Sequence, residues 1–328
     1  MEKRFFLRVV GSIAGIFALV FVFNYVIDPF NLNGRFDLGL PKTTTSQVID
    51  WRLYKSIEFA RRPEPVLVLG DSRCLAWQAA WFAEEGEPHV YNFSFGGGSL
   101  QEAIDAFWFA DSHVQLERVY LCIPFSLYSA ESVASLMPQA GALADDPVRY
   151  YLSPLVTRAS YENLSAKWTG EQLRPGNPSS DRAAFWKFQL EKTAPKQFAG
   201  WAPPDNLWPE LERIAQHARE RGIDLRIVVP PTHVTLQARV ADFGHAREFA
   251  AYPCELARLA PVLDFDWPSA LTRDETAFLD PSHLEAAASR RVVRGVVAGF
   301  SPDARSLAFD PSGASCPPAF EPGAGPAP

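Results

Sequence analysis

The residues best suited to do chemistry are a serine after an apolar run and an aspartate–histidine pair near the end of the chain. Ser72 follows the apolar segment 66–70 after one residue, Asp71, and the segment predicts a buried strand leading into a helix. A serine hydroxyl is a poor nucleophile until a positioned base removes its proton. His283 can be that base, and Asp280, three residues earlier, can fix the tautomer of its ring. This set predicts nucleophilic transfer of an acyl group.

Both parts of this set are predicted to lie at one edge of a parallel sheet. Ser72 follows the strand at 66–70 and the pair follows a strand at 262–265, so both lie after carboxyl ends, where open α/β sheets bind ligands. The helix that begins near Ser72 also offers free main-chain N–H groups to a developing oxyanion. Simpler roles stay open, because Ser72 can cap a helix and Asp280 with Pro281 can start one.

The rest of the chain predicts the sheet that would position these residues. Short apolar runs alternate with helical patterns, which is typical of βα units and a parallel sheet. We therefore predict an α/β fold, a three-layer α/β/α sandwich with a mainly parallel five-stranded sheet. The expected strands are 66–70, 90–95, 119–124, 225–229 and 262–265, and the expected helices include 51–61, 100–110, 207–221 and 284–300.

Three further segments depart from that pattern. Residues 129–206, rich in Tyr, Trp and Pro, predict an insertion over one end of the sheet that shapes substrate access. Residues 31–65 predict a juxtamembrane segment, and residues 301–328, rich in Pro, Gly and Ser, predict a disordered tail. The expected domains are thus an anchor at 1–30, the juxtamembrane segment, an α/β domain at 66–300 and the tail.

The N-terminus predicts a membrane anchor. Lys3, Arg4 and Arg8 precede an apolar run at 9–27, and about 19 residues suffice to cross the hydrocarbon core of a bilayer. The positive-inside rule predicts a single-pass protein of the inner (cytoplasmic) membrane, with its main domain on the periplasmic, extracytoplasmic side. A cleaved signal peptide is the rival interpretation, although no small-x-small cleavage pattern follows the run.

Composition disfavours several classes of function. The 328 residues carry a net charge of −7, and no basic cluster interleaved with aromatics is present, which disfavours a nucleic-acid partner. No two of the four cysteines form a CxxC pair, which disfavours a structural zinc site, and we expect neither metal nor cofactor. One disulfide is compatible with an exported domain, and the sequence does not choose its partners among Cys74, Cys122, Cys254 and Cys316.

Three blocks of the sequence resemble those of SGNH (GDSL-like) hydrolases. Leu69-Gly70-Asp71-Ser72 resembles the first block, Asn92-Phe93-Ser94-Phe95-Gly96-Gly97-Gly98 the second, and Asp280-Pro281-Ser282-His283 the final DxxH block. The resemblance implies a flavodoxin-like α/β/α fold and a triad in which Ser72 is the nucleophile, His283 the base and Asp280 its orienter. It also implies an oxyanion hole formed by Gly97 and Ser72, although the glycines can equally form a flexible turn.

The resemblance is incomplete at the third block, which in that family supplies an asparagine to the oxyanion hole. After the strand at 119–124 this chain has Phe125-Ser126-Leu127-Tyr128, with no asparagine. Ser126, Arg73 or main-chain N–H groups are candidates to replace it, and loss of one donor typically costs about 10²–10³ in rate. Arg73, Ser126 and His233 are also candidates for substrate binding, although Arg73 can instead pair with a carboxylate and His233 can be structural.

A narrower resemblance concerns the anchor. Asp28-Pro29-Phe30 after the apolar run and Trp51-Arg52-x-x-Lys55 before the first strand are similar to SGNH-like proteins of extracytoplasmic polysaccharide O-acetylation, such as alginate acetylation proteins. This implies a serine esterase or O-acyltransferase that acts on acyl esters, in the simplest case acetyl esters, of a glycan, with a multipass membrane acyltransferase as a partner. The alternative is a non-catalytic glycan-binding or scaffolding component of a cell-envelope polysaccharide assembly, which the missing asparagine favours.

Overall fold

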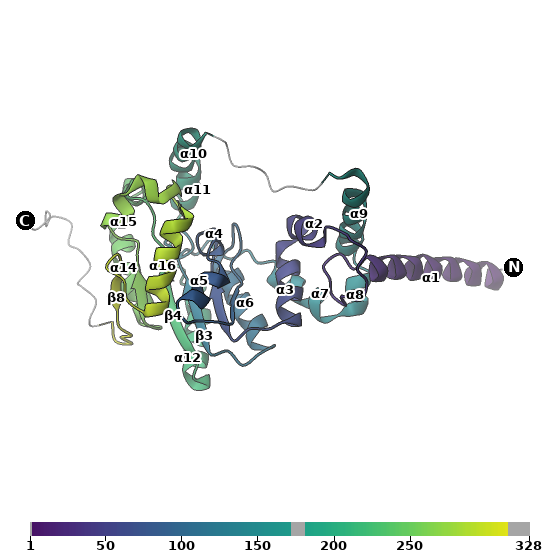
Figure 1. The fold of residues 1–328 in the computed structure, drawn as a ribbon. Coiled ribbons are helices and arrows are strands. Elements are labelled where there is room, and N and C mark those ends of the chain that lie inside the picture. The colour runs from purple at the N-terminus through teal and green to yellow at the C-terminus, as the bar shows by residue number, and fades with distance from the viewer. Residues whose placement is uncertain (1, 172–180, 314–328) are drawn as a thin grey trace, which may run out of the picture. The chain divides into compact units, whose positions relative to one another are not determined.

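The structure is a computed structural model that describes residues 2–171 and 181–313. Its contacts divide the chain into two compact units, the first formed by Met1–Pro63 with Leu136–Asn177 and the second by Glu64–Ser135 with Pro178–Pro328. Figure 1 shows the helices and strands of both units. The insertion predicted at 129–206 is therefore divided between the two units.

The second unit is built on a six-stranded sheet with the order β2-β1-β3-β4-β5-β8. Strands β1 to β5 are parallel, and β8 runs antiparallel to β5. Each of the five predicted strand positions holds one of the parallel strands, whose order is that of flavodoxin-like sheets. The bounds are β1 (Val66–Leu69), β2 (Val90–Asn92), β3 (Arg118–Cys122), β4 (Asp224–Val229), β5 (Val262–Asp264) and β8 (Arg305–Leu307).

The sixth strand corrects two expectations, the count of five strands and the disordered tail from residue 301. Asp264 in β5 is fully buried, and a buried carboxylate needs a charged or hydrogen-bonding partner. Arg305 stands opposite Asp264 in the antiparallel register, and its Nε donates to the carboxylate at 2.9 Å. This ion pair anchors a short polar strand that apolar periodicity does not reveal. The tail residues 314–328 lie outside the described residues.

Helices bury the sheet with apolar side chains. One core cluster joins Phe82 of α5 (Ala79–Glu84) and Val292 of α16 (Ala286–Ala298) with strand residues such as Val68 and Val228. The helices α6 (Leu100–Asp111), α12 (Trp208–Arg221) and α14 (Ala246–Ala257) contact β1, β4 and β5, respectively. Because β1 is buried along its whole length, it reads as a continuous apolar run. The three-layer arrangement stays a prediction.

The remaining elements of the second unit are short. They surround the carboxyl ends of the strands and the connections between them. Their bounds are α4 (Ser72–Leu75), α10 (Arg182–Phe188), the π-helix η1 (Gln189–Thr193), α11 (Ala194–Phe198), α13 (Val234–Asp242), α15 (Ala270–Arg273), the 3₁₀ helix η2 (Glu275–Ala277), and the paired strands β6 (Phe278–Asp280) and β7 (His283–Leu284).

The first unit contains only helices among its described residues: α1 (Glu2–Ile27), α2 (Lys42–Ile49), α3 (Trp51–Arg61), α7 (Met137–Asp145), α8 (Pro147–Tyr151) and α9 (Pro154–Thr169). The bounds of α3 match the predicted helix at 51–61. Among the described residues, one helix, Lys3–Ile27, is long and apolar enough to cross a membrane, a test that a signal sequence also passes.

Polar side chains fix the C-terminal end of α1 inside the first unit. The Asn24 amide is fully buried and donates to the Tyr151 carbonyl and the Thr157 hydroxyl, each at 2.8 Å. The buried Asp28 carboxylate accepts from three successive main-chain N–H groups, at residues 32 to 34, at 2.8 to 3.0 Å. The last turns of α1 are therefore packed against protein, and the exposed apolar part of the helix lies before them.

Candidate active site

The turn after β1 places Ser72 at the start of a short helix. Gly70 ends the strand so close to β3 that a Cβ atom there would lie 2.7 Å from the Cβ of Cys122. Only glycine permits this approach without a shift of the neighbouring strand. Asp71 caps α4, and its carboxylate accepts from the main-chain N–H of Arg73 at 2.9 Å. Ser72 thus becomes the first residue of α4, where helical N–H groups lack intrahelical partners.

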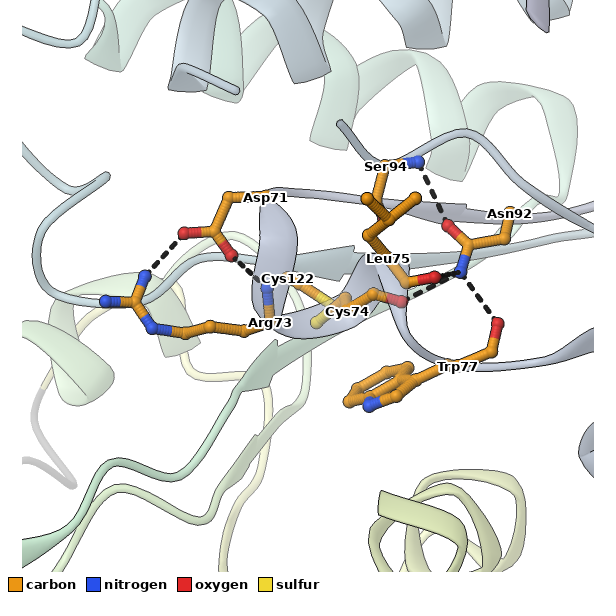
Figure 2. The surroundings of a disulfide bond; sticks show 8 residues. All are labelled: Asp71, Arg73, Cys74, Leu75, Trp77, Asn92, Ser94 and Cys122. Carbon is orange, nitrogen blue, oxygen red and sulfur yellow. Dashed lines mark hydrogen bonds and ion pairs between the residues drawn. A yellow bond between two sulfur atoms is a disulfide. The ribbon is translucent and has the colours of Figure 1, made fainter. Parts of the chain in front are cut away.

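Two further connections hold this turn, as Figure 2 shows. A disulfide joins Cys74 of α4 to Cys122 at the end of β3, and both residues are fully buried. The amide of Asn92, at the end of β2, donates to the carbonyls of Cys74 and Trp77 at 2.8 Å and of Leu75 at 3.3 Å. Strands β2 and β3, which flank β1, therefore both hold the helix that follows Ser72.

The turn between β6 and β7 carries the aspartate and the histidine. The Asp280 carboxylate accepts from the main-chain N–H of Ser282 at 2.8 Å, which closes the turn. The main-chain N–H of His233 donates to the Pro281 carbonyl at 2.9 Å and ties the turn to the end of the β4 segment. The cyclic restraint of Pro281 and the two hydrogen bonds leave the turn one well-defined shape.

The structure brings Ser72, His283 and Asp280 into one hydrogen-bonded row. Ser72 Oγ lies 2.8 Å from His283 Nε2, and His283 Nδ1 lies 2.7 Å from Asp280 Oδ2. The side chain of Asp280 is 5% exposed, whereas that of His283 is 30% exposed, so the carboxylate is shielded and the ring can meet a substrate. With Asp280 accepting at Nδ1, the neutral ring keeps an acceptor lone pair on Nε2, facing the serine hydroxyl.

A cavity of about 430 Å³ opens beside Ser72 and His283. Gly97 and Ser126, two of the residues singled out in the sequence, also line it. The main-chain N–H groups of Ser72 and Gly97 donate no hydrogen bond within the part of the chain that the structure describes. Two free N–H groups bordering one cavity are the donors that an oxyanion needs.

Arg73 also lines the cavity, but its charge is already balanced. Its guanidinium forms an ion pair with Asp71 and donates to the Ser126 hydroxyl at 3.1 Å, and both charged side chains are less than a tenth exposed. Its Nε has no hydrogen-bond partner among the described residues. The sequence left open whether Arg73 binds substrate or pairs with a carboxylate, and in the structure it pairs with Asp71. Through its hydrogen bond to Ser126, Arg73 also links that residue to the Ser72 turn.

The structure places His233 beside aromatic rings. It is absent from the described residues that line the cavity, and its ring packs between those of Trp186 and Phe278, with centroids 4.9 and 5.5 Å away. Its Nδ1 caps α13 by accepting from the main-chain N–H of Thr235. Burial lowers the pKa of His233. It supports the Asp280–His283 turn through its main chain and does not border the cleft.

A buried carboxylate lies behind that turn. Asp266 is almost fully buried and accepts from the main-chain N–H and the hydroxyl of Thr232, at 2.8 and 2.6 Å, and from the Gln237 amide at 2.9 Å. Burial raises the pKa of Asp266 to about 6, and the nearby Asp264 carboxylate adds to the rise, against the hydrogen bonds that lower it. Thr232 directly precedes His233, so this network supports the residue that holds Pro281.

Several residues of the site had no signal of function in the sequence. Gln189, Thr193, Lys196 and Gln197, from η1 and α11, line the cavity, and all lie within the predicted insertion. Nothing in their spacing marks them, because their proximity to Ser72 depends on tertiary packing. The pairing of Cys74 with Cys122 also depends on tertiary packing, because it requires β1 and β3 to be neighbours in the sheet. No group of His, Cys, Asp or Glu among the described residues is arranged to hold a metal ion.

Comparisons with known proteins give little beyond this geometry. No family model matches the chain, and no curated protein matches it. Among solved structures it is similar to a protein from Streptococcus pneumonia provisionally described as a platelet activating factor, with 10% sequence identity and a TM-score of 0.33. That match covers 78% of this chain and 92% of the other. A likeness at this level does not identify a family.

Proposed function

We propose that this chain is a membrane-anchored serine esterase or O-acyltransferase of the SGNH type, with Ser72 as nucleophile, His283 as base and Asp280 as its orienter. The observation that supports it is the row of two short hydrogen bonds from Ser72 Oγ through His283 to Asp280. A serine in contact with a base, and a base held by a third group, is the arrangement that activates a hydroxyl for attack on an ester.

The proposed reaction has two balanced steps. The Ser72 hydroxyl attacks the acyl carbon while its proton passes to His283 Nε2, and the N–H groups of Ser72 and Gly97 stabilise the oxyanion. His283 then gives the proton to the leaving alkoxide, which leaves an acyl-Ser72. In the second step, water or a sugar hydroxyl loses its proton to His283 and takes the acyl group, and the proton returns to Ser72. Asp280 stabilises the imidazolium without being protonated.

The proposal also names a substrate and a location. The substrate class is an acetyl ester of an extracytoplasmic glycan, supported by the sequence resemblance and by a cavity lined with hydroxyl and amide side chains, among them Ser99, Ser132 and Gln197. The apolar helix α1 would anchor the chain in the inner membrane, with the α/β unit on the periplasmic side. A multipass membrane acyltransferase is the proposed source of acyl groups.

Hydrolysis of an aryl acetate by the purified full-length chain tests the activity, with Ser72→Ala as the control. We expect turnover by the natural chain and none above background for the variant. Equal rates for the two proteins would overturn the assignment of Ser72.

A second candidate is a glycan-binding or scaffolding protein that keeps the fold without the chemistry. The segment after β3 favours it, because Ser126 stands where the third SGNH block has an asparagine, and its hydroxyl accepts from Arg73. Under this alternative, Ser72→Ala and His283→Ala bind an acetylated glycan as tightly as the natural chain, and none of the three proteins hydrolyses it.

A further inference from the structure

A second cavity, of about 200 Å³, lies wholly within the first unit. Its walls come from the residues after α1, the start of α2 and one side of α3. Three of its lining residues are cations, Lys42, Arg61 and Arg62, and its single acidic lining residue is Glu58. The cavity therefore has an excess of positive charge although the whole chain is acidic.

None of the three cations forms an ion pair within residues 2–171 and 181–313. Lys42 Nζ donates to the Phe36 carbonyl at 3.3 Å, and the Arg61 guanidinium donates to the Asn31 carbonyl. Burial is the largest effect on Lys42 and lowers its pKa, and Arg61 adds to this, although Asp28 and Asp37 act in the opposite direction. The nearby Asp28 carboxylate is already occupied by three main-chain N–H groups.

The position of the Arg61 guanidinium is fixed by the chain around it. Gly34 adopts a positive φ of 62°, and a Cβ atom there would lie 2.6 Å from a guanidinium nitrogen of Arg61. The glycine thus allows the main chain to pack against the arginine. Arg61 is exposed, and its hydrogen bond to the Asn31 carbonyl keeps the guanidinium beside residues that line the cavity.

The helix α2 adds a further source of positive potential. It begins at Lys42, has no side-chain cap and no acidic residue in its first turn, and both Lys42 and Thr43 line the cavity. The main-chain N–H of Lys42 already donates to the Leu40 carbonyl at 2.8 Å, so this turn offers the N–H of Thr43 and the positive end of the helix dipole. Such an end beside lysine and arginine side chains is a combination that binds phosphate.

We propose that this cavity binds a phosphate monoester or diester group. Phe30 and Asn31, which line it, follow closely on Ile27, where α1 ends, so the site lies where the chain leaves the apolar helix. This position favours the headgroup of a membrane lipid as the source of the phosphate. Free phosphate offers the same oxygens, and the experiment below separates the two sources.

The test is a calorimetric titration of the full-length chain in an uncharged detergent with dihexanoyl phosphatidic acid and, separately, with inorganic phosphate. The variant is Lys42→Gln with Arg62→Gln, two side chains that bear no ion pair in the described structure. The matched control is Arg158→Gln, an exposed cation of α9 in the same unit. We expect the dissociation constant to rise about tenfold or more in the double variant and to stay unchanged in the control.

Binding of the lipid alone would assign the site to a headgroup, and binding of both ligands would show that the phosphate group suffices; both outcomes support the proposal. The absence of binding by either ligand, or equal affinity in the double variant and the natural chain, would overturn it. If the double variant fails to fold, Arg62→Glu at the exposed end of α3 replaces it, with loss of binding as the expected result. None of these outcomes depends on Ser72.

Discussion

The turn that carries Ser72 and the turn that carries Asp280 and His283 meet across one hydrogen bond, yet they are held in different ways. The Ser72 turn is fixed by a disulfide from Cys74 and by the Asn92 amide, so both strands beside β1 hold it. Hydrogen bonds and the ring of Pro281 hold the Asp280–His283 turn, and Asp266, a buried carboxyl, supports one of these bonds through Thr232. The turn that carries Ser72 therefore depends on an intact disulfide. The turn that carries His283 depends on the protonation state of the Asp266 carboxyl.

The largest expected effect tests whether the two turns act as one unit. Ser72→Ala and His283→Ala should each lower kcat/KM for an aryl acetate by about 10⁴-fold or more, because neither residue activates the reaction alone. The double variant should be no slower than either single variant. Ser129→Ala, at another serine that lines the same cavity, should change the rate only a few-fold. Additive losses would show that the two turns contribute independently.

The disulfide gives the next largest effect and acts on the Ser72 turn alone. Replacing Cys74 and Cys122 together by alanine removes a link across 48 residues of chain and should lower the free energy of unfolding by about 3–4 kcal/mol. Activity should fall by at most about 10²-fold, because α4 keeps its contacts with Asn92. Urea unfolding and the esterase assay measure the two quantities. A variant as stable as the natural chain would show that the disulfide does not stabilise the fold.

For the Asp280–His283 turn, the corresponding prediction is that the free energy of unfolding depends on pH through Asp266. The pKa of Asp266, about 6 in the folded chain, exceeds the ordinary 3.8, so between these values the folded chain retains a proton that the unfolded chain has released. This group's contribution to the free energy of unfolding therefore falls as pH rises from about 4 to about 6, by at most about 3 kcal/mol, and is constant above. Asp266→Asn should flatten that part of the profile, whereas the exposed Asp242→Asn should not. A slope that Asp266→Asn leaves unchanged would contradict this role.

The smallest effect concerns the amide of Asn92. Asn92→Ala leaves the Trp77 carbonyl without its donor, whereas the Cys74 carbonyl still accepts from the main-chain N–H of Trp77. A buried group left unsatisfied costs about 1–3 kcal/mol if water cannot reach it. We expect a loss of about 2 kcal/mol in unfolding free energy with the disulfide intact. Gln78→Ala, an exposed amide without a capping hydrogen bond, is the matched control and should be neutral. An equal loss in both variants would mean that the amide does not hold the turn.

The parts of the fold that sequence analysis predicted are those with local signals. The five parallel strands lie in short segments rich in apolar residues, and α3 begins after Asp50, whose side chain caps it. The juxtaposition of Ser72 and His283 followed from a general rule, because both come after carboxyl ends of parallel strands. The strand β8 escaped prediction because a short polar strand gains its place from the ion pair of Arg305 with Asp264.

Features that depend on packing between distant segments were not predictable. The partner of Cys74 requires the knowledge that β1 lies beside β3, and the division of the predicted insertion requires the packing of α7 to α9 with α1 to α3. His233 is a further residue whose surroundings depend on packing. Its position after β4 suggested the cleft, but the apolar rings of Trp186 and Phe278 enclose its side chain and keep it away from the cavity lining.

The most direct test of the central claim is covalent labelling of Ser72. The full-length chain is treated with a fluorophosphonate, which forms a stable adduct with activated serines, and the modified peptide is identified by mass spectrometry. The hydrogen-bonded row predicts one adduct per chain on Ser72, a greatly slowed reaction in His283→Ala and none in Ser72→Ala. A folded natural chain that stays unlabelled, or that is labelled equally fast in His283→Ala, would contradict the account.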